Sequence, residues 1–210
     1  DVAAIGQIAH KYNAMLLVDG AQSVGYTAVN VEELNADMLA VAPHKGLHAA
    51  MGVGILYAGM RVPLTPVRYG GTGTLSSSVY QPHDRPEGFE SGTLPLPAIA
   101  TLIPAIDWVT EHSQDLRSRI QSVTDYVLEE LKKIEGVTVY TPAVHGGIAA
   151  LNIRDYASDH VADILSSEYD IAVRSGLHCA PLAHKALGTE KRGIVRASFG
   201  YETTFAQADM

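Results

Sequence analysis

Lys45 lies where a largely apolar run within residues 36–42 gives way to the short segment PHKG, and His44 directly precedes it. A lysine held partly out of water loses proton affinity and becomes an amine nucleophile, which is what Schiff-base chemistry needs. A lysine in a solvated turn would have the same local sequence. The neighbouring residues therefore have to decide between the two interpretations.

Asp19 and Gln22 follow an earlier apolar run, MLLV at residues 15–18, and lie in one loop. Both runs are typical of buried parallel strands, so Asp19 and Lys45 are expected in one crevice beyond the carboxyl ends of neighbouring strands. A carboxylate for a pyridine nitrogen, an amide for a ring hydroxyl and an amine for an imine are the groups that pyridoxal phosphate (PLP) needs. Taken alone, Asp19 would be interpreted as a turn or helix N-cap residue.

Cys179 is the only cysteine of the chain; His178 precedes it directly, and Arg174 lies five residues earlier. Because a thiolate rather than a thiol attacks sulfur, cationic neighbours in an exposed loop indicate a nucleophilic role. A buried structural cysteine is the alternative interpretation. A zinc site built from His178, Cys179 and His184 is disfavoured, since too few ligands are suitably spaced for a closed tetrahedral centre.

The elements expected to position these residues are short apolar strands and amphipathic helices. Apolar spacing and turn residues predict a helix at 1–13, strands at 15–18, within 36–46 and at 52–59, an irregular segment at 60–96, two helices within 97–135 with a break near His112 and Ser113, strands at 136–141 and 148–153, a helix at 158–169 with Ser158 as N-cap, a strand-like segment at 171–176 and a strand at 193–201. This order favours an α/β domain over residues 1–110 and a small α+β domain over 111–210.

The composition narrows the class of protein. The 210 residues, 47% of them hydrophobic, can bury a substantial core. A formal net charge of -8 with scattered Lys and Arg argues against nucleic acid or an anionic membrane as the main partner. No apolar run long enough to span a membrane and no secretory leader is visible, and one cysteine forms no internal disulfide, so a cytoplasmic location is expected. The chain begins with Asp inside an apparent helix, so we expect part of a longer protein.

Five ordered segments carry a resemblance to a known family: VDGAQSVG, then PHKG with GVGILY behind it, FESGT, VRSGLHCAPLAH and VRASFGYETT. Together they resemble class V aminotransferase-fold enzymes and are most similar to the cysteine desulfurase and selenocysteine lyase group. The resemblance covers essentially the whole chain and corresponds to the middle and C-terminal parts of the family's chain. It implies the PLP-dependent transferase fold type I, with part of a large domain around a mainly parallel sheet and a small C-terminal α+β domain.

For the cofactor, the resemblance implies a role at each matching position. Asp19 would pair with the pyridinium nitrogen of PLP and Gln22 with its phenolic oxygen. Lys45 would hold PLP covalently and move the α-proton of the substrate, and His44 would contribute a donor near the phosphate. These enzymes commonly carry a hydroxyl residue three positions before the lysine, whereas this chain has Ala42. One phosphate contact is therefore expected from elsewhere, and the family's N-terminal phosphate loop and ring-stacking side chain are not in this sequence.

The resemblance also implies substrate and partner contacts. Gly92 and Thr93 would reach the phosphate of a partner subunit, which implies a homodimer with shared sites; plain turn residues are the alternative. Arg196 would grip the substrate carboxylate with its planar guanidinium, supported by Arg174. Both arginines taken alone would be surface ion-pair partners. Cys179 would accept the sulfur.

The predicted activity is that of a PLP-dependent cysteine desulfurase, which converts L-cysteine to L-alanine and leaves a persulfide on Cys179. An acceptor protein would receive the sulfur for iron-sulfur cluster or thio-cofactor synthesis. A selenocysteine lyase, a cysteine sulfinate lyase or an aminotransferase on the same scaffold remains an alternative. A truncated remnant or scaffold without catalysis is the alternative from a different class.

Overall fold

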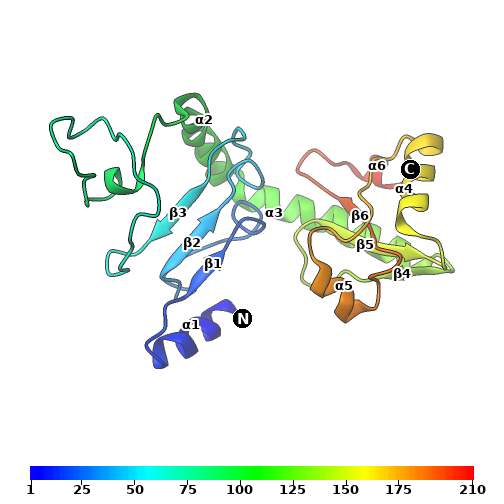
Figure 1. The fold of residues 1–210 in the computed structure, drawn as a ribbon. Helices are drawn as coiled ribbons and strands as arrows, with labels where there is room; N and C mark the ends of the chain where they lie inside the picture. The colour runs from blue at the N-terminus through cyan, green and yellow to red at the C-terminus, as the bar shows by residue number, and fades with distance from the viewer. The chain divides into compact units, whose positions relative to one another are not determined.

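Three short apolar runs form the sheet of the first unit. In the computed structural model, which describes residues 1–210, β1 (Leu17–Asp19) pairs in parallel with β2 (Met38–Val41), and β3 (Ile55–Ala58) pairs antiparallel with β2 (Figure 1). The register sets Asp19 opposite Ala40, so β1 and β2 end at the same edge of the sheet. The loops that follow these two strands therefore begin side by side.

The helix α1 (Val2–Lys11) precedes the sheet and begins at a side-chain cap. Asp1 Oδ1 accepts the backbone N–H of Ala4 at 3.0 Å, which satisfies one of the free donors of the first turn. The apolar stripe that predicts this helix remains accessible, since Val2, Ile5 and Ile8 are exposed. The spacing therefore predicts the helix correctly, although this chain does not bury its apolar face.

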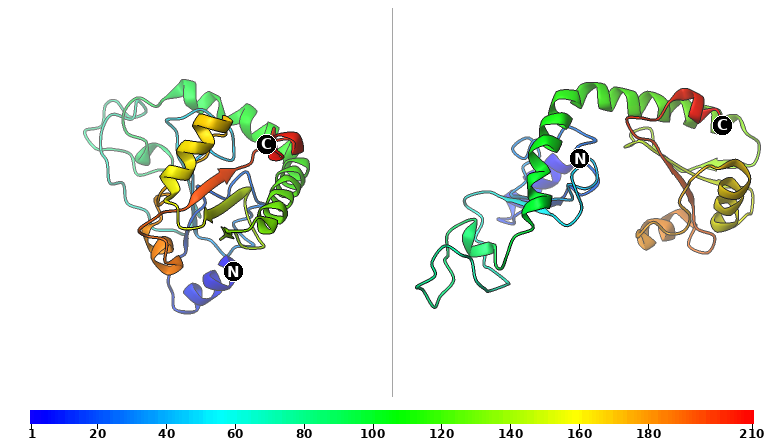
Figure 2. Two further views of the ribbon diagram at one scale, coloured as in Figure 1. Left: turned by 90° about the vertical axis from the view of Figure 1, so that its right-hand side faces the viewer. Right: turned by 90° about the horizontal axis from the view of Figure 1, so that it is seen from above.

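A long excursion with little regular structure leads from β3 to the helices. Between residues 59 and 95 its regular element is the short 3₁₀-helix η1 (Glu87–Phe89), and Figure 2 shows the excursion extending from the sheet. It ends at α2 (Leu96–Ala100), after which α3 (Leu102–Lys133) begins. None of the helices combines the length and the apolar character that a membrane crossing requires.

The predicted helix break near His112 and Ser113 is wrong. The ring of His112 stacks on Trp108, one turn earlier, with centroids 4.8 Å apart, and its Nδ1 lies 2.9 Å from the Trp108 carbonyl oxygen, so local pairs hold α3 together at this point. The break occurs instead at Thr101, between α2 and α3. Pro104 explains this position, because proline has no N–H for the preceding turn and clashes with its carbonyl.

The second unit, Gln114–Met210, is built on an antiparallel sheet of three strands; the boundary with the first unit, Asp1–Ser113, falls inside α3. The sheet has the order β4-β5-β6. Its elements are β4 (Val137–Val139), β5 (Ile148–Ile153), α4 (Ser158–Tyr169), α5 (Pro181–Leu187), β6 (Val195–Ser198) and α6 (Phe205–Ala208). Leu151, Val161 and Val195 form its buried core, against which Leu131 and Leu165 pack.

Two details of this unit differ from the sequence predictions. Ala157, not Ser158, occupies the N-cap position of α4, and the Ser158 hydroxyl instead accepts the backbone N–H of Gly176 at 3.1 Å. The predicted strand at 171–176 is reduced to an isolated bridge between Arg174 and Arg196. The Ser158 hydroxyl thereby takes the N–H of Gly176, at the end of the predicted strand, away from the sheet.

Candidate active site

The loops that follow β1 and β2 touch through two glycines. A Cβ at Gly25 would lie 2.1 Å from the carbonyl oxygen of Gly46, and a Cβ at Gly46 would lie 2.3 Å from that of Val24. Real Cβ atoms do not approach backbone so closely, so a side chain at either position would push the loops apart. This contact holds the loop that begins at Asp19 against the loop that carries Lys45, and the sequence reasoning missed it. The recurrence of glycine soon after each apolar run is the signal that could have found it.

The side chains at the start of the first loop are accessible. The Asp19 carboxylate is exposed and accepts the backbone N–H of Ala21 at 3.0 Å, while Gly20 donates its N–H to the Ala40 carbonyl at 2.8 Å. Asp19 thus closes a turn after β1 and caps no helix, and its other carboxylate oxygen is left for a further partner. Gln22 is exposed as well, and its amide forms no hydrogen bond within the chain.

Lys45 lies in a tight turn after β2. Its backbone N–H donates to Ala42 at 3.1 Å, and its carbonyl accepts from His48 at 3.0 Å. The side chain is half-buried and forms no ion pair, and His44 beside it is exposed. An amine that is partly shielded and has no carboxylate partner within the chain is free to react. These groups fit PLP at this edge of the sheet, except that Ala42 offers no hydroxyl for its phosphate.

Gly92 and Thr93 lie at the end of the long excursion and are exposed. The N–H of Gly92 donates to the Gly71 carbonyl at 2.7 Å, which ties this turn to the glycine-rich segment 70–74. Residues of segment 70–82 line a shallow pocket with a volume of about 320 Å³. The N–H of Gly70 donates to Oε1 of Gln81 at 3.0 Å within this segment. Neither Gly92 nor Thr93 forms a hydrogen bond with Lys45 or Asp19, so the structure does not bring them to the loops of these two residues.

Cys179 occupies an exposed loop of the second unit. Its Sγ lies 3.9 Å from Nη2 of Arg174, which sets a cation beside the sulfur. Arg174 and Arg196 exchange backbone hydrogen bonds of 3.0 and 2.7 Å, so the structure brings the two predicted arginines together beside this loop. The Nε of Arg196 is buried without an acceptor. The alternative of a buried structural cysteine is wrong, because the residue is exposed.

The imidazole of His178 anchors the same loop. Its Nε2 lies 2.9 Å from the carbonyl oxygen of Ile194, and since a carbonyl only accepts, Nε2 carries the proton. Burial of the ring lowers the pKa of His178, and nearby Arg196, His184 and Arg174 lower it further, against the opposing effect of the Ile194 hydrogen bond. The ring is therefore neutral near pH 7, and its Nδ1 is buried without a partner.

The second histidine of the proposed zinc alternative also has an oxygen partner. His184 is buried, and its Nδ1 lies 2.9 Å from Oγ1 of Thr189. The rings of His178 and His184 are 5.8 Å apart. Both imidazoles thus use a nitrogen to fix the chain around Cys179, a structural role that the sequence reasoning did not assign.

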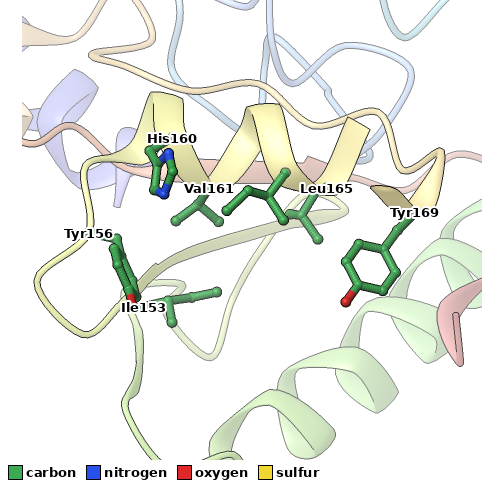
Figure 3. Close-up of a pocket in the computed structure, with 7 residues that line it drawn as sticks. Ile153, Tyr156, His160, Val161, Leu165 and Tyr169 are labelled. Atoms are coloured by element: carbon green, nitrogen blue, oxygen red, sulfur yellow. The ribbon is translucent and has the colours of Figure 1, made fainter. Parts of the chain in front are cut away.

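A separate apolar groove lies along α4. Its volume is about 400 Å³, and Figure 3 shows side chains of α4 facing the end of β5 across it. The groove is lined by Ile153, Tyr156, His160, Val161, Ile164, Leu165 and Tyr169. None of the predicted site residues lines it, so it is distinct from the Cys179 loop.

Comparisons with known proteins agree over the full chain. The family model described as Aminotransferase class-V matches residues 1–210. A probable cysteine desulfurase of Methanothermobacter thermautotrophicus is 36% identical over 211 residues, which cover 97% of this chain and 53% of the relative. A cysteine desulfurase of Salmonella agona is 35% identical over 208 residues, covering 96% and 50%.

Solved structures give the same picture. The apo cysteine desulfurase from Thermococcus onnurineus NA1 matches with a TM-score of 0.92 and 32% identity, over 100% of this chain and 53% of that one. The cysteine desulfurase CsdA from Escherichia coli matches with a TM-score of 0.90 and 25% identity, over 100% and 52%. The chain thus spans about half the length of the relatives it matches.

Proposed function

Because the chain belongs to the aminotransferase class-V family, we propose that it forms about half of a PLP-dependent cysteine desulfurase that converts L-cysteine to L-alanine. The predicted family and the predicted fold class, a part of the type I PLP fold, are confirmed. The observation that carries the proposed activity is the exposed Cys179 thiol with Arg174 Nη2 at 3.9 Å. An aminotransferase needs no such thiol.

The cofactor of this family is PLP, which supplies an electron sink for the α-carbon of a bound amino acid. In this chain Lys45 would hold it covalently and carry the α-proton of the substrate. The Asp19 carboxylate, which retains a free oxygen, would keep the pyridine nitrogen protonated, and the unpaired Gln22 amide would bind the ring oxygen. His44 would donate to the phosphate, where Ala42 cannot.

Sulfur transfer is the task of the second unit. Arg196 would bind the substrate carboxylate through two parallel hydrogen bonds, and Arg174 would support the loop from its paired backbone position. The Cys179 thiolate would attack the sulfur of L-cysteine and break the carbon–sulfur bond. The electron pair of that bond would stay with the carbon, which would take up one proton, equivalent to the one lost by the thiol, to become the methyl group of alanine. The balance is one L-cysteine and one thiol giving one L-alanine and one persulfide.

The exposed residues of the proposed site indicate which partners the protein would have. Gly92 and Thr93 lie on an exposed turn of the long excursion, which supports their reaching the phosphate of a second copy in a homodimer. The exposed position of Cys179 supports transfer of its persulfide sulfur to an acceptor protein. A single accessible thiol also suits a reducing compartment, so we assign the protein to the cytoplasm.

The test is Cys179→Ala in the full-length gene product loaded with PLP. We expect release of sulfide and alanine from L-cysteine to fall by more than about 100-fold, the scale of losing a nucleophile, while the visible absorbance of the cofactor is retained. Ser166→Ala, on an exposed turn of α4, is the control and should match the unmodified protein. Undiminished sulfide release by Cys179→Ala would contradict the proposed role.

A further inference from the structure

The loop of Cys179 leaves the sheet at a residue pair that forms only one of its two expected backbone hydrogen bonds. Arg174 and Arg196 form a full antiparallel pair, which makes Gly176 and Ile194 the next pair along the strands. Half of this pair is present, because the N–H of Ile194 donates to Gly176 at 3.1 Å. The other half is missing, because the N–H of Gly176 turns to Ser158 Oγ at 3.1 Å.

The imidazole of His178 replaces the missing half. The carbonyl of Ile194, left without its backbone donor, accepts from Nε2 of His178 at 2.9 Å. A buried carbonyl without a donor is costly, so this bond both satisfies Ile194 and ties the loop to the residue before β6. The side-chain hydrogen bond of His178, the residue before Cys179, thus takes the place of the missing backbone hydrogen bond of the sheet.

The backbone of the loop needs such a tie. His178 and Cys179 have φ angles of 51° and 59°, in the left-handed region that side chains disfavour. Apart from the N–H of Ala180, which donates to Leu177 at 2.8 Å, no backbone bond is present between Gly176 and α5 to hold these two residues. The side chain of His178 therefore supplies the hydrogen bond that ties these two residues to the sheet.

The neutral state of the ring suits a single donating role. The charged and titratable groups that face His178 are Arg174, Arg196 and His184, and together with burial they disfavour a proton on Nδ1. A ring kept neutral donates through Nε2 alone, to Ile194.

We propose that His178 is a positioning residue, which fixes the direction of the Cys179 thiol by donating Nε2–H to the Ile194 carbonyl. The proposal builds on the proposed function of Cys179 as sulfur acceptor. Attack on a substrate sulfur needs the thiol in one geometry, whereas reaction with a small reagent in solution does not. Loss of the tie should therefore slow sulfur transfer without slowing simple alkylation of the thiol.

Three variants of the full-length gene product separate this role from general stability. In His178→Gln the side-chain amide nitrogen can reach the position of Nε2, in His178→Asn it falls short, and in His178→Ala it is absent. We expect the Asn and Ala variants to lose about tenfold in kcat for sulfide release, a modest misplacement effect, with KM little changed. The Gln variant should retain most of the rate. Alkylation of Cys179 by iodoacetamide should stay within about twofold in all three.

Amide hydrogen exchange in the apo protein tests the tie independently of turnover. The Ala180 amide, bonded to Leu177, should exchange about tenfold faster in His178→Ala and at the original rate in His178→Gln. Unchanged exchange in His178→Ala, or a Gln variant as impaired as the Ala variant, would overturn the proposal. If Cys179→Ala released sulfide normally while this exchange pattern held, the proposed function would fall and the positioning of the loop would stand.

Discussion

Replacing Gly25 by alanine should separate the two loops that carry Asp19 and Lys45. The new Cβ would lie 2.1 Å from the Gly46 carbonyl oxygen, and the clash involves backbone on both sides, so no side-chain rotation relieves it. Overpacking of this kind costs about 1–3 kcal/mol. Gly25 also has a φ of 94°, and this left-handed conformation would cost an alanine about 1–2 kcal/mol more.

Two control glycines separate these contributions. Gly52 has a φ of 100° with no atom within 4 Å of its added Cβ, so Gly52→Ala should show the conformational cost alone. Gly46 has no positive φ, but its Cβ would lie 2.3 Å from the Val24 oxygen, so Gly46→Ala should show the clash alone. Gly54, whose nearest neighbour would be 3.9 Å away, is the matched control for Gly46.

Urea unfolding and absorbance titration with PLP, both on the full-length gene product, measure the outcome. Gly25→Ala should be less stable than Gly52→Ala by about 1–3 kcal/mol, and Gly25→Ala and Gly46→Ala should each bind PLP at least about tenfold more weakly. The two controls should bind PLP as the unmodified protein does. Equal stability and PLP affinity of Gly25→Ala and Gly52→Ala would refute the reasoning that the glycine contact positions the site.

Three further substitutions test other parts of the site and fold. Lys45→Ala should abolish the visible absorbance of bound PLP, and an unchanged spectrum would contradict covalent binding at this residue. Arg196→Lys should raise KM for L-cysteine about tenfold or more, since an ammonium cannot bind a carboxylate in the bidentate manner; an unchanged KM would exclude that contact. The Asp37 carboxylate accepts a hydrogen bond from the backbone N–H of Leu16 at 2.7 Å and lies 2.9 Å from Nε2 of His10, and these contacts lower the pKa of Asp37 from its ordinary value of 3.8. The carboxylate therefore stabilises the fold above about pH 4 and loses this effect as the pH falls through its folded pKa. Asp37→Asn should accordingly cost about 1 kcal/mol in urea unfolding at pH 7, and the gap should close at lower pH; a gap independent of pH would show that the charge is not its source.

Local patterns predict most elements of this chain, and the errors have both long-range and local causes. The strand at 148–153 and the helix at 158–169 match β5 and α4 at both ends, because apolar spacing and flanking turn residues are local signals. Ser158 was wrongly assigned as the N-cap because its hydroxyl accepts a hydrogen bond from Gly176, 18 residues away, and no local pattern reveals this contact. The helix break was misplaced for a local reason, since Pro104 outweighs the polar residues near His112.

The site was predicted through residue types rather than through geometry. The order of strands and polar residues is enough to expect Asp19 and Lys45 at one edge of a sheet, and the parallel pairing of β1 and β2 bears this out. The contact between Gly25 and Gly46 joins residues 21 apart, so it could be seen only in three dimensions. The chemical roles of Asp19, Gln22, His44, Gly92 and Thr93 stay predictions, as do those of the arginines.

The loops of Lys45 and Cys179 meet the same physical demand in similar ways. Side chains that must react with a ligand cannot also anchor their own loop, so the anchoring falls to backbone contacts and neighbouring residues. Near Lys45 this is the approach of Gly25 to Gly46. Near Cys179 it is the hydrogen bond from His178 to Ile194, together with the approach of Gly193, whose added Cβ would lie 2.9 Å from Cα of Gly176 and 2.4 Å from Ser158 Oγ. Closely packed glycines thus help to hold each loop against its neighbour and leave the amine of Lys45 and the thiol of Cys179 accessible, as the nucleophilic roles proposed for them require.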